Sequence, residues 1–171
     1  FGIPLQFEKT YTEGITKITS QDIRYAAELG YCIKHLGISR KTPQGIELRV
    51  HPTLLDEESI IANVNGVMNA VMVNGDAVGS TLYYGAGAGA GPTASAVVAD
   101  IIDVARMISS PQSGVPALAF QDDSLSDMPI LAMDDVISAY YLRITALDKV
   151  GVLADITEIL GKCEIIIEAI I

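Results

Sequence analysis

The residues of this chain that are best suited to chemistry lie in one glycine-rich turn. Gly85, Gly87, Gly89 and Gly91 occupy every second position, and Pro92-Thr93 follows them directly. Glycines at that spacing leave one edge of the backbone without side chains, so a bulky ligand or another segment can approach the peptide groups closely. A helix after the turn would offer free N–H groups and its positive dipole end to a phosphate or cofactor. The residues alone leave a second interpretation open, in which the turn only lets a helix lie tightly on a sheet.

This turn is not the dinucleotide-binding fingerprint. Ala90 stands where G-x-G-x-x-G, read from Gly85, requires its third glycine, and no parallel strand of a βαβ unit follows. The sequence also has no nucleophile elbow, no P-loop and no zinc spacing. We interpret Glu13 and Asp22 as exposed or capping acids, and His51 as a histidine at a strand end. The sequence therefore predicts no catalytic residue and no metal ligand of its own.

The elements on either side of the turn are predicted to be a hairpin and a helix. Two β-rich runs, 69–73 and 77–84, flank Asn74-Gly75-Asp76, and Asn-Gly is the strongest short-range hairpin signal. Pro92 stands where a first helical residue would, and apolar residues recur at helical spacing from Ala94 to Met107. The order is therefore strand, glycine turn, helix.

The segment before the hairpin is predicted to mix helices and strands. Thr19 and Asp22 resemble a capping box that opens a helix over 20–36, which Gly37 would close. Strands over 38–41 and 46–51 are joined by the turn 42–45, His51-Pro52 ends the second, and a shorter helix covers about 58–65. This order favours an α+β fold with a mainly antiparallel sheet and helices on one face.

The C-terminal third divides into a linker and a small unit. Residues 110–139 are rich in turn formers and carboxylates, and we expect a linker pinned down by Leu118, Phe120, Ile130 and Leu131. Strands over 140–147 and 165–171 are predicted to flank a helix that starts near Val152. A β-α-β unit of about thirty residues has no complete core, so it is expected to be truncated or completed by another chain.

Composition limits the classes of partner. The chain has 171 residues, half of them apolar, and a net charge of −10, which disfavours a nucleic-acid partner. No apolar run is long enough to suggest a membrane span, and the start does not read as a signal peptide. Cys32 and Cys163 are interpreted as reduced core thiols of a cytosolic protein. An opening of Phe-Gly-Ile-Pro suggests the interior of a longer chain.

Residues 1 to about 109 resemble the C-terminal half of bacterial homoserine dehydrogenases. Three blocks carry the resemblance: residues 11–19 with 22–23, residues 62–71, and residues 85–94 with 100–101. Residues 148–156 resemble the turn and helix that open an ACT regulatory module, which has a ferredoxin-like β-α-β-β-α-β fold. The implied organisation is a catalytic and dimerisation region at 1–109, a linker at 110–139, and a truncated ACT unit at 140–171.

The resemblance implies an activity and a site. The family interconverts L-aspartate 4-semialdehyde and L-homoserine with NADP or NAD, in cytoplasmic threonine and methionine biosynthesis, and a homodimer is expected. Its catalytic lysine, substrate-binding carboxylates and nucleotide domain lie upstream of Phe1, so this chain alone is expected to be inactive. Gly89 would contact the nicotinamide cofactor, with Gly87 and Thr93 as neighbours, and Gly151 would lie beside an amino-acid effector.

Two other functions remain open at this point. The chain could be an amino-acid-sensing ACT-type regulatory or dimerisation module without catalysis. It could also be a purely structural sheet that dimerises.

Overall fold

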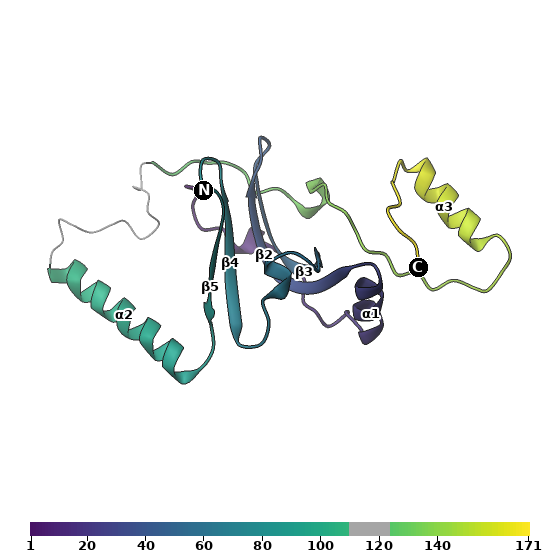
Figure 1. Ribbon diagram of the computed structural model, residues 1–171. Coiled ribbons are helices and arrows are strands. Elements are labelled where there is room, and N and C mark those ends of the chain that lie inside the picture. Colours follow the sequence, from purple (N-terminus) through teal and green to yellow (C-terminus); the bar gives the residue numbers. More distant parts are fainter. Residues whose placement is uncertain (110–123) are drawn as a thin grey trace.

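Two small sheets form the centre of the molecule. The computed structural model describes residues 1–109 and 124–171, and the sheets lie between helices at opposite ends (Figure 1). The first sheet has the order β1-β3-β2, from β1 (Tyr11–Thr12), β2 (Tyr31–Lys41) and β3 (Ile46–Asp56); the second pairs β4 (Met68–Gly75) with β5 (Gly79–Ala86). The helices are α1 (Ser20–Glu28), α2 (Ala90–Ser109) and α3 (Val152–Lys162), with 3-10 turns η1 (Phe7–Lys9), η2 (Ile61–Asn63) and η5 (Met133–Asp135). The β2–β3 and β4–β5 pairs are antiparallel and the short β1 is parallel to β3, which confirms the α+β class.

Helix α1 is shorter than the predicted 20–36. Its start is as predicted, because Thr19 and Asp22 form a capping box. It ends at Glu28, because Gly30 has a φ of +80° and so takes the left-handed conformation that closes a helix. The predicted role of Gly37 is wrong, since Gly37 lies inside β2 opposite Val50. Cross-strand pairing of β2 along β3 outweighs the helical spacing of apolar residues in this segment.

The β2–β3 hairpin is longer than predicted on both sides of its turn. The turn itself is confirmed, with the Thr42 N–H donating to the Gly45 carbonyl at 2.8 Å. Pro52 does not end β3, which continues to Asp56 with Pro52 opposite His35. β1 covers β3 only at Arg49 and Val50, so within the described residues Pro52 lies on an edge, where a missing N–H costs no ladder bond. The helix predicted over 58–65 is only the 3-10 turn η2.

The β4–β5 hairpin is confirmed, but its turn lies further along the chain. Asn74 and Gly75 are still paired, with Ser80 and Gly79 respectively. Asp76 turns the chain instead, with its Oδ1 accepting the Ala77 N–H at 2.8 Å. The loop therefore has three residues, a length that hairpins also use.

The C-terminal part of the predicted linker lies along the start of β3. The Ile46 N–H donates to the Pro129 carbonyl at 2.8 Å, and the Leu131 N–H donates to the Ile46 carbonyl at 2.9 Å. A Cβ on Gly45 would lie 2.5 Å from the Pro129 oxygen, so the segment can approach only because residue 45 has no side chain. This confirms the expected anchoring at Ile130 and Leu131, whereas Leu118 and Phe120 lie outside the described residues.

The C-terminal unit forms its helix but not its strands. α3 begins at Val152 as predicted, while residues 140–147 and 165–171 have no regular secondary structure. Within the described residues no neighbouring strand pairs with either segment, and an isolated strand is not stable in water. The two cysteines are free, but only Cys32 is partly buried; Cys163 is exposed, so its predicted place in a core is wrong.

Helix α2 has no buried residue along its twenty residues. Its apolar side chains are exposed: Val97, Val98, Ile101, Ile102, Val104, Met107 and Ile108. An exposed apolar face of this kind is typical of an interaction surface. Among residues 1–109 and 124–171, no helix has the length and apolar character needed to span a lipid bilayer.

Candidate functional site

The glycine turn connects the end of β5 to the start of α2. The Gly87 N–H donates to the Val67 carbonyl at 3.1 Å, which ties the turn to the residue before β4. Gly89 has a φ of +114°, a conformation that side chains disfavour, and its carbonyl accepts the Thr93 N–H at 3.1 Å as α2 begins. The helix starts at Ala90, so Pro92 is its third residue. The prediction that Pro92 would be the first helical residue is wrong. Proline costs no helical hydrogen bond there, because N–H groups in the first turn have no partner within the helix.

The turn has room for a flat or anionic group. A Cβ on Gly85 or Gly91 would meet nothing within 4 Å, and a Cβ on Gly89 would only contact Pro92, at 3.5 Å. The turn residues are exposed. The first hydrogen bond of the helix is the one that the Thr93 N–H donates to the Gly89 carbonyl, so the N–H groups of Ala90 and Gly91 have no partner within the helix. These groups point out of the helix end, where the helix dipole favours negative charge. Open space, bare backbone and free donors together make the turn accessible to a flat or anionic group.

Around Gly87 there is no open space, because the side chain of Asn69 occupies the position that a Cβ would take. A Cβ on Gly87 would lie 1.4 Å from Nδ2 of the exposed Asn69 side chain, so either that side chain or the turn would have to move. Asn69 lies on β4 opposite Gly85, which places its amide against the turn. Sequence reasoning did not identify Asn69 as a site residue. A hairpin with its turn at 76–78 places Asn69 opposite Gly85, and this register would have indicated that Asn69 lies beside the glycine turn.

The predicted site residues lie at the N-terminal ends of two separate helices. Gly87 and Gly89 precede α2, and Thr93 lies in its first turn and is exposed. Gly151 is the N-cap of α3, with its carbonyl accepting the Asp155 N–H at 2.9 Å and open space around it. Helices α2 and α3 lie at opposite ends of the molecule (Figure 1), so Gly151 belongs to a different place from the glycine turn.

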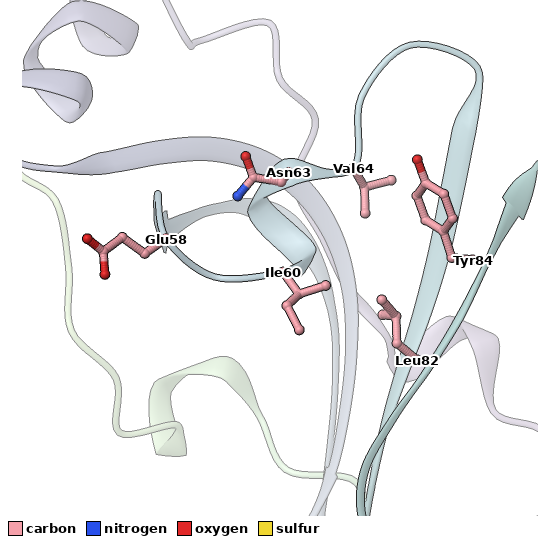
Figure 2. Close-up of a pocket in the computed structure, with 6 residues that line it drawn as sticks. All are labelled: Glu58, Ile60, Asn63, Val64, Leu82 and Tyr84. Atoms are coloured by element: carbon pink, nitrogen blue, oxygen red, sulfur yellow. The ribbon is translucent and has the colours of Figure 1, made fainter.

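A hollow lies beside the strand that leads into the turn. Its volume is ≈ 470 Å³, and Leu82 and Tyr84 of β5 face Ile60 and Val64 across it (Figure 2). Asn63, at its edge, donates through Nδ2 to the Glu57 and Ser59 carbonyls at 2.9 and 3.0 Å. The lining is mainly apolar, so the hollow suits an apolar group rather than a charged one. In the described residues, no three His, Cys, Asp or Glu side chains gather as a metal site.

One polar cluster surrounds Asp22, which is only 3% exposed. Asp22 Oδ2 accepts the Thr19 N–H at 2.8 Å and the Thr19 hydroxyl at 2.6 Å. Asp22 Oδ1 accepts the Tyr141 hydroxyl and pairs with Arg143 Nε, each at 3.0 Å. The Thr19 hydrogen bonds, followed by Tyr141 and Arg143, hold the pKa of Asp22 below its usual value and outweigh the opposing effect of burial. The interpretation of Asp22 as a capping acid is confirmed, but it is buried and also contacts the C-terminal segment.

The pKa of Asp22 gives an expected pH dependence of stability. Because its folded pKa lies below the ordinary 3.8, the ionised carboxylate stabilises the fold above that pH, and this contribution is lost as pH falls through the lowered value. Asp22→Asn should remove that part of the acid sensitivity, as measured by urea midpoints between neutral and acidic pH. Asp103→Asn is the control, since Asp103 pairs with Arg106 on the exposed surface of α2. Equal acid sensitivity in Asp22→Asn and the unmodified protein would contradict this role.

Comparisons with known proteins cover both the sequence and the fold. The family model described as homoserine dehydrogenase matches residues 1–102. Homoserine dehydrogenase of Pseudomonas aeruginosa is 66% identical over 171 residues, covering 99% of this chain and 39% of that protein. The Neisseria gonorrhoeae enzyme is 58% identical over 172 residues, covering 100% of this chain and 40% of that protein. The chain thus spans about two-fifths of the length of these curated relatives.

A solved structure shares the arrangement of the elements. The crystal structure of a homoserine dehydrogenase from Thiobacillus denitrificans has a TM-score of 0.90 and 62% identity, covering 100% of this chain and 40% of that one. Because the match extends over the whole chain, the C-terminal segment and the sheets have a similar relative placement in that crystal structure.

Proposed function

Since this chain belongs to the homoserine dehydrogenase family, we propose that it is the sheet-forming and cofactor-facing portion of an NAD(P)-dependent oxidoreductase. The reaction is the interconversion of L-aspartate 4-semialdehyde and L-homoserine. The observation that carries the proposal is the bare, exposed turn at residues 85–91, which opens the longest helix of the described chain. A nicotinamide cofactor, when bound, supplies the hydride acceptor or donor.

The residues of the turn have separate tasks in this proposal. Gly89 lets the backbone lie close to the nicotinamide or its ribose, and Thr93 lies one helical turn further on at the same corner. Because Gly87 has no side chain, the Asn69 amide can lie against the turn, and the two residues together fix the shape of the turn. The first N–H groups of α2 favour the negative charge of the cofactor. The proton-transfer group and the substrate carboxylates belong to the three-fifths of the relatives' length that this chain does not span.

The partners follow from the surfaces left uncovered. The apolar face of α2 is proposed to be covered by the rest of the enzyme, and the sheets to take part in a homodimer. We place the enzyme in the cytoplasm, with NADP or NAD as its cofactor.

The C-terminal unit is proposed to be the start of an ACT module. Its helix forms where the resemblance requires it, with Gly151 at the N-terminus of α3. That observation also supports a second function, in which the chain senses an amino acid beside Gly151 without catalysing a reaction. Hydride transfer distinguishes the two functions, because a sensing module binds an amino acid but supports no turnover.

The proposal predicts activity only in a completed enzyme. We expect the 171 residues alone to give no homoserine-dependent reduction of NADP or NAD. A chimera in which they replace the matching segment of the Pseudomonas aeruginosa relative should be active, because that relative supplies the groups this chain lacks. The measurement is nicotinamide absorbance at steady state, with the parent enzyme as control. Turnover by the chain alone, or a folded but inactive chimera beside an active parent, would contradict the proposal.

A further inference from the structure

A lysine side chain links the first sheet to the loop that enters β4. Lys34 lies inside β2, opposite Thr53 of β3, and its side chain is partly buried. Its ammonium group donates to the Val64 carbonyl and to Asn65 Oδ1, both at 2.8 Å. Hydrogen bonds from a charged donor are among the stronger ones in proteins. Lys34 therefore holds this loop against a strand that is paired with β3 along its whole length.

The loop that Lys34 holds carries the contacts that reach the glycine turn. The Asn65 carbonyl accepts the N–H of Met68, where β4 begins, at 3.3 Å. The Val67 carbonyl accepts the Gly87 N–H at 3.1 Å. Asn65 and Val67 are separated by a single residue, so a shift of the loop reaches the glycine turn over a very short stretch of backbone.

Apolar packing alone leaves this side of the glycine turn weakly fixed. Within the described residues, the β4–β5 pair shares no strand pairing with the first sheet. Leu82 and Tyr84 of β5 face Val64 across a hollow of ≈ 470 Å³ (Figure 2). Side chains that line a hollow lose part of their packing contacts and so constrain two elements less than close-packed side chains do. The directional hydrogen bonds of Lys34 supply the constraint that is missing there.

We propose that Lys34 is a positioning residue of the glycine turn. By holding the loop at 64–65, Lys34 sets the position of the Val67 carbonyl. This carbonyl in turn holds Gly87, and with it the bare backbone at Gly89. Lys34 itself touches neither nucleotide nor substrate. The inference rests on the proposed function for the identity of the ligand, but the placement of the turn can be measured without any ligand.

The first test measures NADPH binding and steady-state kinetics in the chimera. Lys34→Met keeps an unbranched side chain but removes its donors, so the Kd and KM of NADPH should rise about tenfold, the scale of losing hydrogen bonds from a charged group. The KM of L-aspartate 4-semialdehyde should change far less. Lys34→Arg keeps the charge and should bind NADPH more tightly than Lys34→Met. The matched control is Lys41→Met, in the same strand, because the Lys41 side chain is exposed and has no hydrogen bond or ion pair among the described residues.

The second test is hydrogen exchange in the chimera without nucleotide. In Lys34→Met, exchange should become about tenfold faster at residues 64–68 and 85–89 and should stay unchanged at residues 46–51. Asn65→Ala removes one acceptor at an exposed position and keeps the contact with the Val64 carbonyl. It should therefore produce a smaller change in the same two regions.

Each other outcome overturns the positioning role. Faster exchange at 64–68 alone means that Lys34 holds the loop but not the turn, and faster exchange everywhere means general destabilisation. A lower kcat with an unchanged Kd for NADPH means that Lys34 acts only on folding. If Lys34→Met does not fold, unchanged exchange at 85–89 in Asn65→Ala overturns the role. Failure of the unmodified chimera to bind NADPH counts against the proposed function, while exchange without nucleotide still decides the role of Lys34.

Discussion

Gly87→Ala is expected to lower kcat/KM of the completed enzyme by about 10²-fold or more, the scale reached when a site is displaced by about 1 Å. The added Cβ would lie 1.4 Å from Asn69 Nδ2, so either Asn69 or the turn must move. Both lie at the corner to which we assign the cofactor. The measurement is steady-state kinetics of the chimera, together with its thermal midpoint.

A second substitution separates this clash from other effects. In Gly87→Ala with Asn69→Ala, the nearest remaining side-chain atom is the Asn69 Cβ at 3.2 Å, a contact that small shifts can relieve. We expect the double variant to regain most of the lost activity. Gly85→Ala is the matched control for folding, because its Cβ meets nothing within 4 Å and the thermal midpoint should stay unchanged. An active Gly87→Ala enzyme, or no recovery in the double variant, would show that the contact does not shape the turn.

Glu47→Ala is expected to have the largest effect on stability, about 3–5 kcal/mol, because it leaves a largely buried arginine without its ion-pair partner. Glu47 is 2% exposed and pairs through Oε2 with Arg49 Nη2 at 3.3 Å, and the Arg49 side chain is 11% exposed. Arg49 Nε has no hydrogen-bond partner among the described residues, and the contact of Arg49 Nη1 with His51 Nε2 is long, at 3.5 Å. Urea unfolding of the unmodified protein and the variant measures the loss.

The other partners of Glu47 provide the controls. Arg40 donates to Glu47 Oε1, but its side chain is 54% exposed, so Arg40→Ala should cost no more than about 1 kcal/mol. Replacing Glu47 and Arg49 together by Leu should cost far less than Glu47→Ala, because no uncompensated charge stays buried. If Glu47→Ala and Arg40→Ala proved equally mild, Glu47 would not be holding a buried charge.

Local signals in the sequence predicted the elements that depend on neighbouring residues. The capping box at Thr19, the turn at 42–45, the order of hairpin, glycine turn and helix, and the start of α3 all form as expected. In each case one or two residues impose the backbone conformation. The resemblance also placed residues 1–109 in the family that the comparisons identify.

Elements that depend on pairing with distant residues were not predictable in this way. Residues 31–36 have apolar spacing that suits a helix, and only their pairing with β3 makes them a strand. The turn expected at Asn74-Gly75 lies instead at 76–78, which changes the residue opposite Asn69 and hid its contact with Gly87. The contact of Asp22 with Tyr141 joins residues 119 positions apart, and no local pattern indicates it.

A crystal structure of the chimera with NADPH tests the central claim most directly. We expect the nicotinamide end to lie against the backbone at Gly89, beside the Gly87 and Asn69 contact and the first turn of α2. A nucleotide bound elsewhere, with the turn covered by the enzyme's own side chains, would contradict the cofactor-facing role of this portion.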